Sequence, residues 1–386
     1  SRRTSRGWGP AVRGEPMSSD LWRDALSRML ARVDQTGRSV TQGFPHFADP
    51  ATGAWTTSPA GDWTGGFWNA MCWLAARSTG ETRYREWALR WTERLRPRVH
   101  SDTVFRGFLF YYGAVTGALL LNSALAREVA LAGARGLAAS YNPRAEALPL
   151  GSDAEEASDV GTGEANVDTV QGGALLLWAF RATGDPMLRE IAVKHALRHI
   201  EFCARADGSI CQSASFDPET GKMLRRYTHK GIHDDSTWAR AQAWGIVGYT
   251  HMYQWEREPR FLEVACGAAD WWLAHAPRDR VAFWDFDDPA IPRTSRDTSA
   301  TAIVTASLLK LAELAPSEAK RREYRQAAEE TAAALVRDYL TPAGILTHGC
   351  YNKKIGLAPQ HELIWGSYYL FESLHVLAGR LAPTEI

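Results

Sequence analysis

The most informative pattern along the chain is a repeated pair of helix-like segments. Residues 71–79 are apolar on nearly every face and end at Gly80, and apolar positions then recur every three or four residues through 81–89. Equivalent pairs lie at 108–137, 176–193, 249–265 and 308–327. We therefore predict helical hairpins in which the first helix is buried all round and the second exposes a charged face.

Two further helical segments, 20–33 and 366–381, have no neighbouring partner along the chain. Pairing them with each other gives six hairpins, which either stack as an open solenoid or close into a toroid. The units differ in length and their connections are rich in aromatic and polar residues, which favours the closed toroid. Strand signals are weak, and we expect only small rim hairpins such as 208–212. We find no linker, so residues 18–386 are predicted to form a single domain.

In such a toroid, the residues just before each inner helix surround one mouth. Four of these segments combine aromatic rings with a charge or an amide, namely 62–68, 106–112, 234–244 and 362–369, and the other two, 166–171 and 296–300, carry charges or amides without an aromatic ring. Closing a ring of helices does not require this combination, whereas a pocket for a polar ring with stackable faces does. The sequence therefore predicts a carbohydrate-like ligand at the mouth.

Charge and composition narrow the possible partners. The 386 residues contain 44 Lys and Arg against 44 Asp and Glu, so the chain lacks the basic excess typical of nucleic-acid or membrane-surface binding. Sixteen Trp accompany 12 Tyr and 13 Phe, which suits either a core or a stacking surface. We predict no nucleic-acid and no membrane partner, and leave monomer and homodimer open.

Five scattered cysteines without a CxxC motif indicate free thiols, of which we expect four to be buried and inert. There is no recognisable secretory signal and no apolar run of about 18 residues, so we expect a cytoplasmic protein. Residues 1–17 are basic and lack an apolar stretch, which predicts a disordered or non-native leader. Met17 and the Ser-Ser-Asp that follows it resemble a natural start and a helix N-cap.

Asp168 is the first candidate for catalysis, because a long apolar run follows it almost directly. A carboxylate in such surroundings is poorly solvated, which raises its pKa and makes it a possible general acid near neutral pH. The alternative is that Asp168 caps a helix beginning near Thr169. The spacing alone favours neither reading.

Arg240 lies between Trp238 and Trp244 and is a candidate for binding a carboxylate with two hydrogen bonds. The alternative is a buried ion pair with Asp234 or Asp235. The segment before it carries further candidates, which either bind an acidic substrate or decorate a loop: His229, Lys230 and His233.

Metal and cofactor sites are not predicted. His229 and His233 are four residues apart, but they lie in a glycine-containing loop without a matching third ligand cluster. Gly65 and Gly66 are not followed by the Lys-Ser/Thr of a phosphate loop. No nucleophile motif of the serine or cysteine hydrolases is visible.

Several motifs together resemble the unsaturated glucuronyl hydrolases of glycoside hydrolase family 88, in order from about Phe44 to the end of the chain. They are Asp62-Trp-Thr-Gly-Gly-Phe-Trp, Val167-Asp, Phe216-Asp-Pro-Glu-Thr-Gly, Thr228-His-Lys-Gly, Asp234-Asp-Ser-Thr-Trp-Ala-Arg-Ala-Gln-Ala-Trp, Trp284-Asp-Phe, Arg296-Asp-Thr-Ser-Ala and His348-Gly-Cys-Tyr-Asn. The resemblance implies an all-α (α/α)6 barrel and an exo-acting hydrolase of lyase-generated oligosaccharides. It also implies removal of the C4=C5 unsaturated uronate at their non-reducing end.

The resemblance also implies a reaction and roles for individual residues. An aspartic acid protonates C4 of the enol ether, water adds at C5, and the resulting hemiketal collapses to release the saccharide and a keto acid. Asp168 falls on this acid/base residue. The residues implied or selected for substrate binding are Trp63, Phe67, Gln212, His229, Lys230, Trp238, Arg240, Trp244 and Lys354.

The chain departs from the family pattern near the predicted site. Phe105 stands where the family has a second aspartate, and Asp102 could replace it in catalysis only if the loop shifts. Gln212 replaces a histidine, Lys230 a glutamine, and Ser367 an aspartate. Together with Arg106, these changes predict a more cationic pocket, which suits a sulfated or doubly acidic substrate. They could also lower the pKa of Asp168.

Two other functions stay open at this point. One is a uronate-specific lyase acting by β-elimination, with Tyr111, Tyr112 or His229 as the base and Arg240 neutralising the uronate. The other is a non-catalytic binder of acidic oligosaccharides. Ultraviolet absorbance separates them, because hydration destroys the conjugated double bond, elimination creates it and binding leaves it unchanged.

Overall fold

The computed structural model describes residues 19–157 and 161–386, and the predicted leader 1–17 lies outside them. Four helical hairpins have the predicted form: α2 (Gly65–Thr79) with α3 (Thr82–Leu95), α8 (Gly172–Thr183) with α9 (Pro186–Cys203), α10 (Ala239–Glu256) with α11 (Pro259–His275), and α12 (Thr298–Leu314) with α13 (Glu318–Ala334). No helix in these two ranges is long and apolar enough to cross a membrane.

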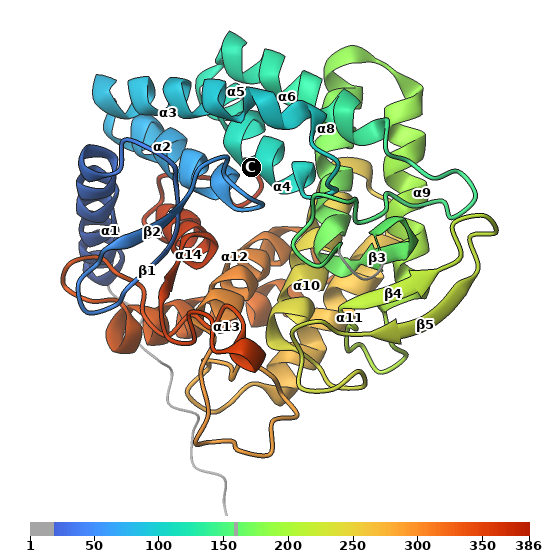
Figure 1. The fold of residues 1–386 in the computed structure, drawn as a ribbon. Coiled ribbons are helices and arrows are strands. Elements are labelled where there is room, and N and C mark those ends of the chain that lie inside the picture. The colour runs from blue at the N-terminus through green and yellow to red at the C-terminus, as the bar shows by residue number, and fades with distance from the viewer. Residues whose placement is uncertain (1–18, 158–160) are drawn as a thin grey trace, which may run out of the picture.

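The other two hairpins complete the ring. In one, α4 (Arg106–Phe110), a π-helical turn at Tyr111–Val115 and α5 (Thr116–Leu121) form a single broken inner helix that pairs with α6 (Ala124–Ala138). In the other, α1 (Ser19–Ser39) packs against α14 (Ile364–Leu377), which joins the two ends of the described chain. Figure 1 shows the resulting toroid, so the all-α (α/α)6 barrel is confirmed.

The inner and outer helices differ as the hydrophobic pattern predicts. The inner helices α2, α4, α8, α10, α12 and α14 contact one another in sequence around the ring. In α10, every residue from Ala239 to Met252 is buried, whereas the outer helix α13 buries little besides its alanines, Tyr324 and Thr331. Close contact between inner helices requires glycine at Gly66, since a Cβ there would lie 2.6 Å from the carbonyl oxygen of Phe108.

Two small antiparallel sheets form the rim. One has the strand order β2–β1–β6, with β1 (Phe44–Ala48), β2 (Trp55–Ser58) and β6 (Glu362–Leu363). The other has the order β3–β4–β5, with β3 (Glu164–Asn166), β4 (Ser213–Phe216) and β5 (Met223–Tyr227). The hairpin expected at 208–212 is present only in minimal form, as a turn closed by one antiparallel bridge between Ala204 and Ile210, and the strand that follows begins at Ser213.

The hairpin turns follow from local chemistry. Gly80 and Gly184 end their helices with φ of 71° and 78°, a left-handed conformation that costs glycine little. Asp185 caps the next helix through its side chain, and Pro186 follows at the first helical position. These capping residues determine where the inner helix of a hairpin ends and where its outer partner begins. All five cysteines are free, and four are buried.

Candidate active site

Asp168 lies at the mouth of the barrel, where β3 passes into a 3-10 turn (Val167–Gln171) and then α8. The cap of this turn is Asn166, whose side-chain oxygen accepts a hydrogen bond of 3.0 Å from the Asp168 backbone N–H. The capping role considered for Asp168 is therefore wrong, and its carboxyl is not used by the helix. Its Oδ1 is buried without a hydrogen-bond partner, while the residue as a whole keeps partial exposure.

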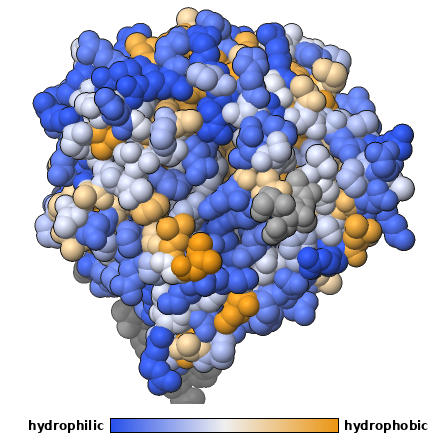
Figure 2. Space-filling view, viewed as in Figure 1, coloured by the Kyte–Doolittle hydropathy of each residue, from blue (hydrophilic) through white to orange (hydrophobic). Residues whose placement is uncertain are grey.

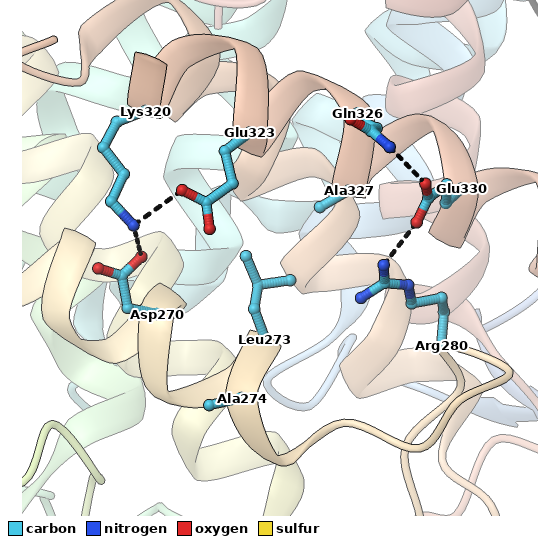
Figure 3. Close-up of a pocket in the computed structure, with 9 residues that line it drawn as sticks. All are labelled: Asp270, Leu273, Ala274, Arg280, Lys320, Glu323, Gln326, Ala327 and Glu330. Atoms are coloured by element: carbon cyan, nitrogen blue, oxygen red, sulfur yellow. Dashed lines mark hydrogen bonds and ion pairs between the residues drawn. The ribbon is translucent and has the colours of Figure 1, made fainter. Parts of the chain in front are cut away.

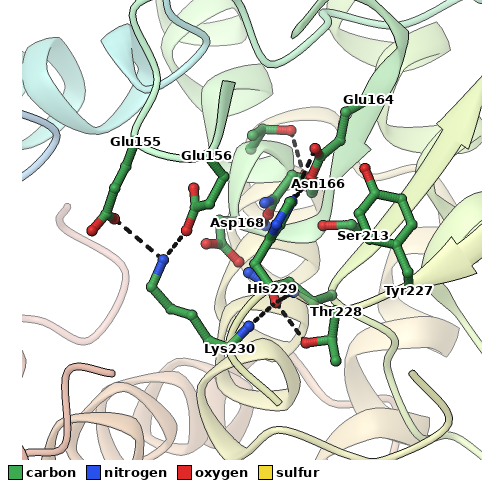
Figure 4. Close-up of polar contacts among 12 residues, drawn as sticks. Glu155, Glu156, Glu164, Asn166, Asp168, Ser213, Tyr227, Thr228, His229 and Lys230 are labelled. Carbon is green, nitrogen blue, oxygen red and sulfur yellow. Dashed lines mark hydrogen bonds and ion pairs between the residues drawn. The ribbon is translucent and has the colours of Figure 1, made fainter. Parts of the chain in front are cut away.

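This environment changes the acidity of Asp168. The pKa of its carboxyl is raised to about 8: burial is the largest cause, the nearby charges of Glu164 and Glu155 act in the same direction, and the positive charge of Arg240 opposes them. The carboxyl is therefore largely protonated at neutral pH and can donate a proton. Figure 4 shows it among Glu156, Asn166 and His229. The predicted direction of the pKa shift is confirmed.

An aromatic wall stands beside this acid, and Trp63 is at its centre. The indole N–H of Trp63 donates to the Tyr351 hydroxyl at 3.1 Å, and its ring lies 4.6 Å from that of Trp365. Trp244 is 6.3 Å from both Trp63 and Phe67. The structure thus brings together three of the four aromatic residues predicted here, Trp63, Phe67 and Trp244, while the fourth, Trp238, lies against Arg240. Sequence reasoning missed Tyr351 and Trp365, although both lie in segments selected as mouth or motif.

The position of the missing second aspartate belongs to the same wall. Phe105 is 5 % exposed and stacks on Phe108 with ring centroids 6.0 Å apart. Asp102 is exposed, and its carboxylate accepts hydrogen bonds from the Ser152 backbone N–H at 2.9 Å and hydroxyl at 2.7 Å. These bonds lower the pKa of Asp102. The described contacts of Asp102 are with this loop, so the structure does not bring it to Asp168.

Arg240 is buried and its contacts correct the expected ion pair. Its Nη1 donates to Asp297 Oδ2 at 2.9 Å and to the Cys350 carbonyl at 2.6 Å, and its Nη2 donates to the Tyr351 carbonyl at 2.5 Å. The partner is thus Asp297, which also caps α12, and not Asp234 or Asp235. The guanidinium lies 4.5 Å from the ring of Trp238. Arg240 therefore ties the aromatic wall to the inner helices.

Gln212 organises the turn that carries the remaining predicted cations. Its side-chain oxygen accepts hydrogen bonds from the Thr228 hydroxyl at 2.7 Å and from the backbone N–H groups of His229 at 2.8 Å and Lys230 at 3.1 Å. The side-chain oxygen therefore holds the turn after β5. The backbone carbonyl of Gln212 accepts a hydrogen bond of 2.8 Å from the Val167 N–H, so Gln212 also joins this turn to the start of the 3-10 turn. Gln212 thus positions both side chains that follow.

Both of those side chains already have carboxylate partners (Figure 4). His229 Nε2 lies 2.8 Å from Glu164 Oε1, and Lys230 Nζ lies 3.2 Å from Glu155 Oε2 and also contacts Glu156. The expectation of a more cationic pocket is therefore wrong. Sequence reasoning missed these three glutamates, although the acidic run at 153–156 was a visible signal.

Arg106 and Lys354, expected near the substrate, have other surroundings in the structure. Arg106 donates to the carbonyls of Thr103 at 2.9 Å and Val99 at 3.1 Å and to Ser140, so its charge holds the rim loop together. Lys354 is exposed in the short turn Lys353–Ile355, on the loop that follows Tyr351. Within residues 19–157 and 161–386, no three His, Cys, Asp or Glu side chains gather as metal ligands.

A second hollow, of about 460 Å³, lies on the outer ring between α11 and α13 (Figure 3). Its charges pair with one another: Lys320 Nζ lies 2.8 Å from Asp270 and 3.0 Å from Glu323, and Arg280 lies 2.6 Å from Glu330. Its lining residues are otherwise aliphatic or amide. Such paired surface charges are typical of the contact between two packed helices and not of a catalytic site.

Comparison with known proteins places this geometry in a family. The chain is 34% identical over 367 residues to the unsaturated glucuronyl hydrolase of Bacillus sp. strain GL1, covering 92% of this chain and 96% of that protein. It is 30% identical over 323 residues to the unsaturated chondroitin disaccharide hydrolase of Streptococcus pyogenes serotype M1, covering 81% and 80%. A search of protein-family models gave no match.

Solved structures agree with the sequence comparison. The crystal structure of the Bacillus sp. GL1 enzyme aligns with a TM-score of 0.87 and 33% identity, covering 92% of this chain and 96% of that one. The structure of a substituted UGL with dGlcA-Glc-Rha-Glc gives the same TM-score, identity and coverage. The extent of these matches, together with Asp168 at the aromatic mouth, shows that the chain belongs to the unsaturated glucuronyl hydrolase family.

Proposed function

We propose that this protein is an exo-acting glycoside hydrolase for oligosaccharides produced by polysaccharide lyases. It removes the C4=C5 unsaturated uronate from their non-reducing end. Family membership supports the reaction class. The observation that carries the proposal is a buried, unpaired carboxyl oxygen of Asp168 with its pKa raised to about 8, beside an aromatic wall.

The proposed chemistry uses Asp168 first as an acid and then as a base. The neutral carboxyl gives its proton to C4 of the enol ether, and water attacks C5 while the Asp168 carboxylate accepts the proton released by that water. The hemiketal at C5 then opens: the C5–O5 bond breaks, the C5 hydroxyl becomes a keto group, and its proton is balanced by the one that O5 gains. This leaves an open-chain hemiacetal at C1, which breaks its bond to the saccharide oxygen, passes its hydroxyl proton to that oxygen and becomes an aldehyde. An acid with a pKa near the working pH suits both proton transfers.

The wall suits the flat ring that this reaction requires. Trp63, Phe67 and Trp244 offer aromatic faces for stacking, and the Lys230 ammonium lies 5.9 Å from the ring of Tyr351, which belongs to the same wall. The partner we propose is accordingly an acidic oligosaccharide, in keeping with the oligosaccharide carried by the related UGL structure. A reducing compartment such as the cytoplasm suits the five free thiols.

The structure gives no support to the β-elimination alternative. Burial raises the pKa of Tyr111 and of Tyr112, so neither hydroxyl ionises readily to act as a base. His229 faces Glu164 at 2.8 Å. A lyase would need a base exposed to the sugar, whereas the unpaired carboxyl oxygen of Asp168 belongs to a group whose raised pKa makes it an acid.

The decisive experiment follows ultraviolet absorbance with unsaturated uronyl disaccharides, using the wild type and Asp168→Asn. We expect absorbance to fall with the wild type and to stay constant with the variant, because Asn cannot donate the proton. A sulfated and an unsulfated disaccharide are compared in parallel. Absorbance that rises on an intact acidic polysaccharide, with no fall on any disaccharide, would move the protein to the lyases.

A further inference from the structure

The contacts of Lys230 carry an inference that deepens the proposed function and rests on it. The Lys230 side chain is 6 % exposed, and its ammonium group contacts two carboxylates, Glu155 and Glu156, from the loop before β3. One ammonium between two carboxylates leaves one negative charge in excess. An excess charge beside a buried ammonium is unfavourable, and the side chains of Glu155 and Glu156 keep 30 % and 13 % of their surface exposed, so one carboxylate can leave Lys230 for solvent.

The two glutamates are not equivalent. Glu155 accepts a hydrogen bond of 2.9 Å from the Tyr351 hydroxyl through Oε1, while its Oε2 lies 3.2 Å from Lys230 Nζ. Tyr351 is in turn held by Trp63 at 3.1 Å. Glu155 is thus held at both oxygens, by Tyr351 of the aromatic wall and by Lys230. Among the residues that the structure describes, the Glu156 carboxylate contacts Lys230 and has no anchor on the aromatic wall like that of Glu155.

The other cations near the mouth are committed to the scaffold. Arg240 donates through both terminal nitrogens to Asp297 and to two backbone carbonyls, and the fully buried Glu164 faces His229. Lys230 therefore differs from them, because its partners come from a rim loop and not from the barrel. An anion entering the mouth can replace a loop carboxylate on Lys230 without dismantling an inner helix.

We propose that Lys230 is the anion-recognition residue of this site and that Glu156 is its exchangeable counterion, which the carboxylate of an incoming uronate displaces. Glu155 stays on Tyr351 and Lys230 during the exchange. The number of charges around Lys230 is then the same before and after binding, so one substrate carboxylate is accommodated at little electrostatic cost. Glu156 sets specificity by competing with every anionic ligand for the same ammonium.

The test measures binding apart from turnover, by calorimetry on an Asp168→Asn background with an unsaturated uronyl disaccharide. We expect Glu156→Gln to tighten binding about five- to tenfold, because the neutral amide competes less well for Lys230. Lys230→Met should weaken binding at least about tenfold. The carboxyl-reduced disaccharide should bind all three proteins within about twofold, since it has no charge to exchange.

The matched control is Glu190→Gln, which removes the same charge from an exposed pair with Lys194 at 2.8 Å on the outer helix α9, and it should leave the dissociation constant unchanged. Binding that is unchanged or weaker in Glu156→Gln would overturn the exchange, as would an equal gain for the neutral sugar. If absorbance never falls but the affinities shift as expected, the exchange stands and the hydrolase proposal fails. If absorbance falls but the affinities do not shift, the exchange alone fails.

Discussion

Replacing Asp168 by Asn should abolish turnover and at the same time stabilise the fold, and both effects come from the same buried proton. Burial raises the pKa of Asp168 from 3.8 to about 8 in the folded chain. The folded state therefore binds this proton more tightly than the unfolded state. Its stabilising effect is fully present below about pH 4 and is lost progressively as the pH rises to about 8.

The magnitude follows from the size of this window. Each pH unit inside it removes about 1.4 kcal/mol from the free energy of unfolding, so the loss between about pH 5 and about pH 8 approaches 4 kcal/mol. Asn does not titrate and does not suffer this loss. The stability gained by Asp168→Asn over the wild type should therefore grow by about 4 kcal/mol across that range.

Urea unfolding followed by circular dichroism at about pH 5 and about pH 8 measures this growth. Asp102→Asn is the control: its pKa is lowered by hydrogen bonds from Ser152, so Asp102 is ionised in folded and unfolded chains throughout the window. Its stability difference from the wild type should not vary with pH. A gap for Asp168→Asn that is equally flat would refute the reasoning, because Asp168 would then not retain its proton near neutrality.

Two further results are expected. In the wild type, kcat/KM should fall as the pH rises through about 8, since Asp168 must be protonated to act; Glu155→Gln should move this decline to lower pH, because the Glu155 charge helps to raise the pKa. An unmoved decline on a stopped-flow absorbance profile would exclude that coupling. Arg240→Met should lower the free energy of unfolding by about 3–5 kcal/mol by leaving Asp297 buried and unpaired, and adding Asp297→Asn should restore part of it. A loss below about 1 kcal/mol in urea titrations would contradict this.

The helical architecture could be predicted because its signals are local. The apolar positions of a helix recur with a period of 3.6, and a glycine such as Gly80 or Gly184 marks its end, so the length of each helix can be read from a short stretch of sequence. Six such helical pairs can be arranged as a closed ring in few ways. The rim sheets could not be predicted, because their strands are two to five residues long and lack alternation. In β5 (Met223–Tyr227), four of five residues are exposed. Such strands are specified by partners far along the chain, which no short window contains.

The features of the site also fall into those that depend on nearby residues, which could be predicted, and those that depend on distant residues, which could not. The raised pKa of Asp168 could be predicted, because the apolar residues that bury it come almost directly after it in the sequence. The partner of Arg240 could not, because two aspartates lay close by in sequence while the actual partner, Asp297, is 57 residues away on α12. The carboxylates on Lys230 are 74 and 75 residues away. The net charge of a pocket is a sum over distant segments, and counting cations near one motif misjudges it.

That sum changes which substrate the departures from the family pattern favour. Phe105 removes a carboxylate from the start of α4 and completes an aromatic wall, while Glu155 and Glu156 bring carboxylates from a different loop. Lys230 is thus not an unpaired cation available to a sulfate group, since two carboxylates, those of Glu155 and Glu156, already contact its ammonium group. A singly charged uronate can exchange for Glu156, but a second anionic group at the same place would meet Glu155 uncompensated. The arrangement therefore favours a substrate with one negative charge at the ring that enters the mouth.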